Sequence, residues 1–197
     1  MKKKILIIGF VWPEPKSTAA GSRMMQLIHS FLEEEYHITF ATTTTKTDNA
    51  YNLKSINVEE KEIVLNSSCF DSFITILQPD IVLFDRFITE EQFGWRVAEQ
   101  CPNALRILDT EDLHGLRKGR QQAFKDNKTF DKRYLYNDTT KREIASIYRS
   151  DFSLIISESE MDLLQNQFKI DSSLLLYLPF MLNSISKKRI NKLPEFK

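Results

Sequence analysis

Short apolar runs alternate with amphipathic stretches along almost the whole sequence. This alternation is typical of a parallel β-sheet covered by helices. Most of the runs are rich in Ile, Leu and Val without polar alternation, as expected for strands that are buried on both faces. The predicted strands are residues 4–10, 38–42, 62–65, 81–84, 105–108, 154–156 and 174–178. We therefore expect an α/β fold with an open, mostly parallel sheet and helices on both faces.

Helix signals fill the gaps between these strands. Apolar residues at i, i+3, i+4 and i+7 predict helices at 22–34 and 70–77. Thr89 with Gln92 and Ser157 with Glu160 have the capping-box pattern of helix starts.

Two segments depart from the alternation. The region 112–150 is too long for one connection and contains no strand pattern, so it predicts two helices, about 116–126 and 139–148, inserted after the fifth strand. Residues 183–197 are polar and basic without apolar periodicity, which indicates a linker or tail after a domain spanning 1–182.

Composition excludes several classes of protein. The chain has 27 Lys plus Arg against 27 Asp plus Glu, so its net charge gives no reason to expect a nucleic acid partner. Cys69 and Cys101 have no metal-ligand spacing, which favours a cytoplasmic protein with reduced thiols over a zinc or disulfide protein. The basic start and apolar run imitate a signal peptide, but Pro13 and the charged residues after it favour a first strand. No run reaches the ~18 apolar residues that a membrane span needs.

The loop after the first predicted strand is the best candidate site. In open α/β sheets, ligands bind at the carboxyl ends of strands, and a helix start offers free N–H groups to anions. Neither GxGxxG nor GxxxxGK[ST] is present, which argues against NAD and ATP. The candidate substrate contacts here are Ser17, Ala20, Gly21, Ser22 and Arg23. Two plainer interpretations stay open: the glycine eases a turn, and the arginine pairs with a nearby carboxylate.

Three segments carry a family resemblance. The stretch AGSRMMQL (20–27) resembles the opening of family-4-like glycosyltransferases, where a pair of small residues precedes the first helix. The stretch HITFAT (37–42) resembles the family's HxVTVxT strand, and RSDFSLIISESE (149–160) resembles its ADxVIxxSxxE segment. The three segments occur in the family's order between residues 5 and 182.

The resemblance implies the amino-terminal domain of a GT-B fold. Members have two Rossmann-like domains, the first contacting mainly the acceptor and the second binding a nucleotide-sugar. The second domain carries a Glu-x7-Glu signature, and the resemblance, which ends at residue 182, does not reach that domain. The resemblance therefore implies that the donor-binding domain is absent from this chain. It implies no cofactor and no metal site, since GT-B enzymes generally need no bound metal for the sugar step.

The same resemblance indicates candidate catalytic residues after the fifth predicted strand. Family members often place a histidine there that faces the donor sugar; here Glu111 takes the equivalent place, and His114 lies three residues on. Asp112 is a further candidate contact. Asp109, Glu111 and Asp112 are also of the type that binds hard cations, although such loop carboxylates are more often solvated. Asp85 and Arg86 follow the fourth strand and are expected at the same sheet edge, with an ordinary strand-to-helix turn as the alternative.

These observations predict part of a glycosyltransferase that transfers sugar from a nucleotide-sugar to a carbohydrate or lipid-linked acceptor, inactive as this chain alone. The alternative is a catalytically inert Rossmann-like binding module. The region 112–150 holds ten Lys or Arg against five Asp or Glu with interleaved aromatics, so peripheral contact with an anionic membrane is a second expectation. A solvated basic face with its aromatic side chains packed inward is the more common reason for such a composition.

Overall fold

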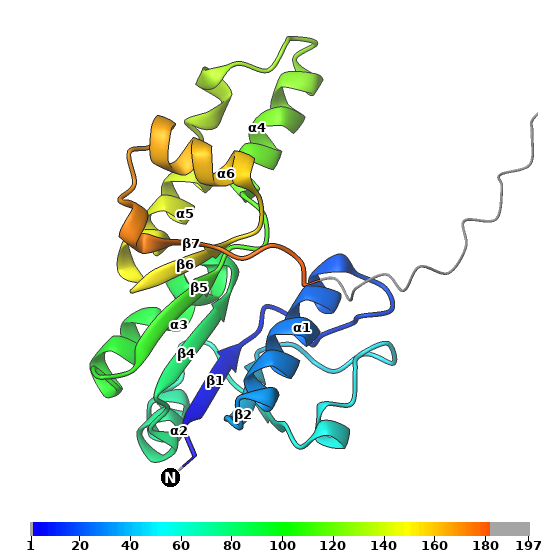
Figure 1. Ribbon diagram of the computed structural model, residues 1–197, viewed down its shortest axis with the longest axis vertical. Helices are drawn as coiled ribbons and strands as arrows, with labels where there is room; N and C mark the ends of the chain where they lie inside the picture. Colours follow the sequence, from blue (N-terminus) through cyan, green and yellow to red (C-terminus); the bar gives the residue numbers. More distant parts are fainter. Residues whose placement is uncertain (1, 182–197) are drawn as a thin grey trace, which may run out of the picture.

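The computed structural model describes residues 2–181 and contains one seven-stranded sheet (Figure 1). All strands are parallel and lie in the order β3-β2-β1-β4-β5-β6-β7. Their bounds are β1 Lys4–Ile8, β2 His37–Thr42, β3 Glu59–Glu62, β4 Ile81–Asp85, β5 Leu105–Asp109, β6 Phe152–Ile155 and β7 Leu175–Tyr177. The predicted α/β fold with a parallel sheet is confirmed.

Helices cover both faces of the sheet, and each face has its own core. On β1, Ile5 and Ile7 belong to one core, whereas Leu6 and Ile8 belong to the other, because successive strand residues point to opposite faces. Helix α1 (Ala19–Glu33) packs on the first face together with the short helix η1 (Leu53–Ile56). The second face is covered by α2 (Ser68–Leu77), α3 (Arg86–Gln100), α5 (Asp138–Arg149), α6 (Glu158–Asp162) and η3 (Leu163–Gln167).

The predicted helical insertion follows β5. It consists of α4 (His114–Lys125), η2 (Lys132–Leu135) and α5, and α4 projects beyond the end of the sheet (Figure 1). Ser157 caps α6 as expected, since its hydroxyl accepts a hydrogen bond from the N–H of Glu160. The short helix η4 (Ser172–Leu174) leads into β7.

Two local predictions were wrong. The third strand was placed at 62–65 on its apolar residues, but β3 is the charged segment Glu59–Glu62. It lies at the sheet edge with a single neighbour, where charged residues are tolerated. The helix expected to start at Thr89 begins at Arg86 instead, directly out of β4; the Thr89 hydroxyl donates to the carbonyl of Asp85 within its first turn.

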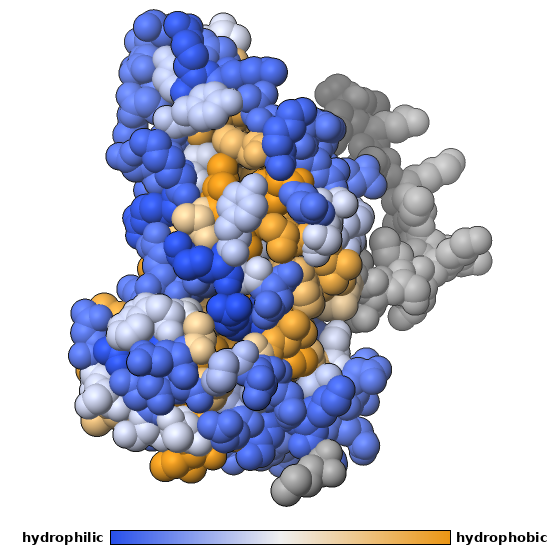
Figure 2. All heavy atoms as spheres, turned by 90° about the vertical axis from the view of Figure 1, so that its left-hand side faces the viewer, coloured by the Kyte–Doolittle hydropathy of each residue, from blue (hydrophilic) through white to orange (hydrophobic). Residues whose placement is uncertain are grey.

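One side of the molecule exposes apolar side chains. Figure 2 views the molecule from the left of Figure 1 and shows apolar side chains gathered across its middle. Leu105, Leu176 and Tyr177, on strands β5 and β7, are among the exposed large apolar residues. No helix among residues 2–181 is both long and apolar enough to cross a bilayer. The predicted basic tail, 183–197, and the domain limit at 182 lie outside the described residues.

Candidate functional site

A pocket of about 350 Å³ opens at the carboxyl ends of β1 and β4. These neighbouring strands mark the point where the strand order reverses, which is the usual ligand site of an open α/β sheet. Three loops and the start of α1 form its walls. Its lining residues are Phe10, Val11, Trp12, Pro13, Glu14, Thr18, Ala20, Gly21, Met24, Thr44, Thr45, Thr47, Asp85, Arg86 and Glu111.

The loop after β1 is held in place by contacts of Trp12 and Thr18. Trp12 packs on Phe40 and donates from its indole Nε1 to the carbonyl of Thr44 at 2.8 Å. Thr18 caps α1: its hydroxyl accepts a hydrogen bond from the N–H of Gly21, and the helix starts at Ala19 rather than at residue 22 as predicted. A Cβ on Gly21 would lie 2.5 Å from the backbone of Glu14. Gly21 is therefore required because the backbone at Glu14 passes too close to the helix for any side chain at this position.

Asp85 is a buried carboxyl in the pocket wall, only 4% exposed. Its Oδ2 accepts a hydrogen bond from the N–H of Phe10 at 2.9 Å, while its Oδ1 has no hydrogen-bond partner in the described chain. Burial raises the pKa of Asp85 from its ordinary 3.8 to about 7; the carboxylate of Glu111 adds to this shift and Arg86 opposes it. The group can therefore both accept and donate a proton near neutral pH.

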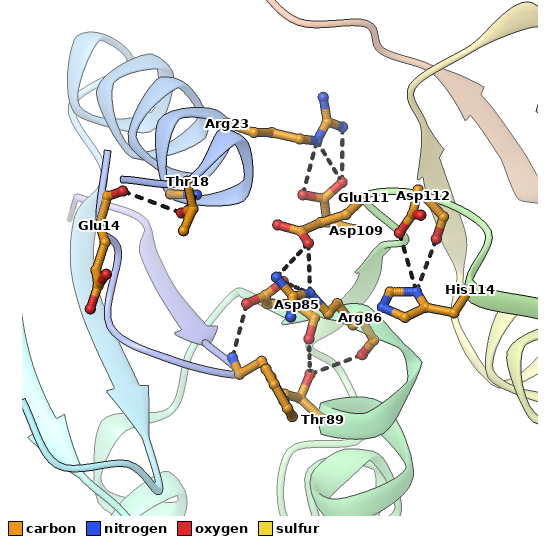
Figure 3. Close-up of polar contacts among 12 residues, drawn as sticks. Glu14, Thr18, Arg23, Asp85, Arg86, Thr89, Asp109, Glu111, Asp112 and His114 are labelled. Atoms are coloured by element: carbon orange, nitrogen blue, oxygen red, sulfur yellow. Dashed lines mark hydrogen bonds and ion pairs between the residues drawn. The ribbon is translucent and has the colours of Figure 1, made fainter. Parts of the chain in front are cut away.

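Arg86 and Glu111 form an ion pair beside Asp85 (Figure 3). The Nε of Arg86 donates to the Oε2 of Glu111 at 2.6 Å, and the guanidinium lies 5.0 Å from the centre of the Phe10 ring. Both residues have left-handed backbones, with φ of 72° and 58°. Such conformations are strained for side-chain-bearing residues and cluster at functional sites, so their pairing at the ends of β4 and β5 marks this pocket wall as a candidate site.

Arg23 is not available to a ligand. Its side chain is 1% exposed and donates from Nε and NH2 to both carboxylate oxygens of Asp109, at 2.8 to 3.1 Å. Its NH1 donates to the carbonyl of Leu178 at 2.9 Å. The ion-pair interpretation of Arg23 is therefore the one that the structure supports.

The two predicted catalytic residues do not meet in the pocket. Glu111 lines it, whereas His114 lies on the far side of Arg86 and Glu111 from Glu14 and Thr18 (Figure 3). The N–H of His114 donates to a carboxylate oxygen of Glu143 on α5, and its ring packs edge-on against Phe87. His114 is thus part of the start of α4, held by the insertion.

The remaining predicted contacts are divided between pocket and surface. Ala20 lines the pocket with Gly21, but Ser17 and Ser22 bond to the loop itself, to Glu14 and to the carbonyl of Pro15. Asp112 pairs with Arg117 at 3.0 Å. The carboxylates of Asp109, Glu111 and Asp112 therefore each form an ion pair with a different arginine. Among residues 2–181 there is no cluster of side chains that could hold a metal ion.

The fold is similar to the folds of solved glycosyltransferase structures. No protein-family model and no curated protein sequence matches the chain. A sucrose-phosphate synthase from Thermosynechococcus elongatus superposes with a TM-score of 0.64 at 14% identity, over 90% of this chain and 48% of that chain. The lipopolysaccharide outer core galactosyltransferase WaaB in apo form gives a TM-score of 0.57 at 15% identity, over 92% and 47%. Arabidopsis thaliana UGT89C1 complexed with UDP-L-rhamnose gives 0.54 at 12%, over 91% and 54%.

The chain has the fold of one GT-B glycosyltransferase domain. It spans about half the length of the structures it matches, in agreement with the predicted amino-terminal domain. The likeness at these identities concerns the fold.

Sequence reasoning missed the pocket wall that follows β2. Thr44, Thr45 and Thr47 line the pocket opposite Asp85 and Arg86. A signal was available, because four threonines in succession, 42–45, directly follow the second strand and reach the same sheet edge. Phe10 was also counted as part of the strand, although β1 ends at Ile8 and the phenylalanine faces the pocket.

Proposed function

We propose that this chain is the acceptor-side domain of a nucleotide-sugar-dependent glycosyltransferase, and that its pocket binds the acceptor. The observation that carries the proposal is the pocket at the switch point of a GT-B-like sheet, with Asp85, Arg86 and Glu111 at its inner end. A second Rossmann-like domain, facing this pocket, supplies the nucleotide-sugar. The acceptor is a carbohydrate, free or lipid-linked.

In this proposal the apolar wall orients the acceptor and the charged end contacts its hydroxyl groups. Phe10, Val11 and Met24 give a surface for the apolar face of a sugar ring. Asp85 and Glu111 offer acceptors for hydroxyl hydrogens, and Glu111 is the group of the predicted catalytic pair that reaches the pocket. His114 then supports the loop rather than touching the acceptor.

Saccharide binding by this chain tests the proposal. Ala20→Phe places a ring in the pocket, whereas Ala19→Phe adds the same ring on the exposed neighbouring position of the same helix turn. Saturation-transfer NMR with mono- and disaccharides should show binding to wild type and to Ala19→Phe, and none to Ala20→Phe. Equal binding by both variants would place the saccharide elsewhere and leave an inert binding module as the better description.

The isolated chain is expected to transfer no sugar, because the donor site belongs to the other domain of this fold. Incubation with radiolabelled nucleotide-sugars and saccharide acceptors should give no product above a blank without protein. Product formation would show that this domain alone holds both substrates.

Membrane contact through the insertion is a separate part of the proposal. Arg120, Lys125, Lys128 and Lys132 have no ion-pair partner within residues 2–181, and Phe124 is 83% exposed among them. Basic and aromatic side chains together favour an anionic bilayer surface. Co-sedimentation with vesicles should rise with phosphatidylserine content and fall with salt; binding that ignores both would exclude this contact.

A further inference from the structure

One buried oxygen of the pocket lacks a donor. The Oδ1 of Asp85 makes no hydrogen bond within the described residues, although the residue is 4% exposed and lines the pocket. The Nε of Arg86 lies 3.5 Å away, too far for a hydrogen bond, and it donates to Glu111 instead. A buried carboxylate oxygen without a donor is costly, so a ligand that donates to it gains more than the same contact would give in water.

The charges around this oxygen are mainly negative. The pocket is lined by three carboxyl groups, on Glu14, Asp85 and Glu111, and by a single cation, Arg86. That cation is occupied, because its guanidinium pairs with Glu111 and lies over the Phe10 ring. Arg23 is paired with Asp109 behind Glu111, so it brings no free positive charge to the pocket. When Asp85 is ionised, its carboxylate and that of Glu111 outnumber the Arg86 guanidinium at the inner end, so the net charge there is negative and favours cations.

We propose that the inner end of the pocket binds an amine, so that the acceptor is an amino sugar or another amine-bearing molecule with an apolar face. This rests on the proposed function and narrows its acceptor to a chemical class. The ammonium group donates to the Oδ1 of Asp85 and lies near the carboxylate of Glu111, while the apolar side of the ring lies on Phe10, Val11 and Met24.

Proton equilibria at Asp85 agree with this assignment. Burial and the Glu111 carboxylate hold the pKa of Asp85 at about 7, so the empty pocket keeps this carboxyl largely protonated in mildly acidic solution. A bound ammonium group favours the ionised form of Asp85, because it supplies the positive charge that Arg86, paired with Glu111, does not give to this carboxylate. The opposite end of the pocket, at the start of α1, favours anions through the helix dipole, but there the Gly21 N–H is already capped by Thr18.

Charge-matched probes separate this inference from the proposed function. Benzylamine, benzyl alcohol and benzoate share one ring and differ in charge, and glucosamine and glucose form the corresponding sugar pair. Trp12 lines the pocket and reports binding by fluorescence once the distant, exposed Trp95 is replaced by Phe. We expect benzylamine to bind about tenfold more tightly than benzyl alcohol, since hydrogen bonds to charged groups exceed neutral ones by about that factor. Glucosamine should exceed glucose similarly, and benzoate should bind least.

Two variants locate the effect. Asp85→Asn keeps an acceptor for the Phe10 N–H and should abolish the preference for the amine, and Glu111→Gln should reduce it. Asp138→Asn, on the exposed start of α5, is the matched control and should leave the preference unchanged. If Asp85→Asn does not fold, Glu111→Gln alone decides, because it lies on a different loop.

The outcomes point in distinct directions. Equal binding of benzylamine and benzyl alcohol, tighter binding of benzoate, or an amine preference that survives both pocket variants would overturn the inference. If glucose and glucosamine bind equally and benzylamine is not favoured, the acceptor pocket stands without the amine. If benzylamine is favoured but neither sugar binds, the amine site stands and the proposed acceptor function loses its support.

Discussion

Replacing Arg23 by methionine tests the most buried ion pair of the structure. The variant removes the three hydrogen bonds from Arg23 to Asp109 and the one to the carbonyl of Leu178, while keeping a flexible apolar side chain. The side chains of the pair are 1% and 0% exposed, so water cannot solvate the carboxylate that is left behind. Breaking such a pair on one side costs about 3–5 kcal/mol.

That cost is large for a domain of this size. Domains are stable by about 5–15 kcal/mol, so Arg23→Met should remove about a fifth or more of the free energy of unfolding. The melting temperature should fall by roughly 10 °C. Urea unfolding followed by circular dichroism measures the first quantity, and calorimetry measures the second.

A surface pair provides the control, and a double variant tests the reasoning. Lys141→Met breaks the exposed pair with Asp138 and should cost about 0.5 kcal/mol or less. Arg23→Met combined with Asp109→Leu leaves no buried charge and should be more stable than Arg23→Met alone. A loss for Arg23→Met no greater than for Lys141→Met, or an additive loss in the double variant, would refute the argument from burial.

Three further perturbations follow from single contacts. Gly21→Ala should destabilise by about 1–3 kcal/mol in urea unfolding, because the added Cβ meets the backbone of Glu14; in an open helix position the same change stabilises, so a gain would contradict the contact. Asp85 has a folded pKa above its unfolded value, so its contribution to stability is complete below pH ~4 and is lost as pH rises through 7, up to roughly 4 kcal/mol. Urea unfolding measured from pH 4 to 8 should show the free energy of unfolding of wild type falling with pH, and falling less in Asp85→Asn. Equal pH dependence in the two proteins would refute this contribution of Asp85. Glu143→Gln should lower hydrogen-exchange protection at Gly115, whose N–H donates to that carboxylate; unchanged protection would show that the cap is dispensable. The groups whose charges or donors act on Asp85 in the pH experiment are Glu111, Arg86, Asp109 and the N–H of Phe10.

Elements with strong local patterns were predictable from the sequence. The buried runs of β1, β2, β4 and β5 were found near their observed positions, and so were the two helices of the insertion. The exception was β3, whose charged residues give no apolar signal because the strand lies at the sheet edge. The predicted helix starts were less accurate. The left-handed backbone at Arg86 lets α3 follow β4 without a loop, and no residue pattern predicts such a turn.

The sequence alone determined the order of strands and helices, and hence which loops emerge at the ligand-binding edge, because apolar periodicity is a local property. Only the tertiary structure decided what each polar side chain does there. Arg23 and Asp109 are 86 positions apart, and they pair because the start of α1 and the end of β5 meet at the same edge of the sheet. Likewise, Asp85 acquires its raised pKa from burial beneath the Phe10 loop and from Glu111 on the neighbouring strand end. Burial and long-range electrostatics depend on which segments meet in space, and a local pattern of residues does not contain that information.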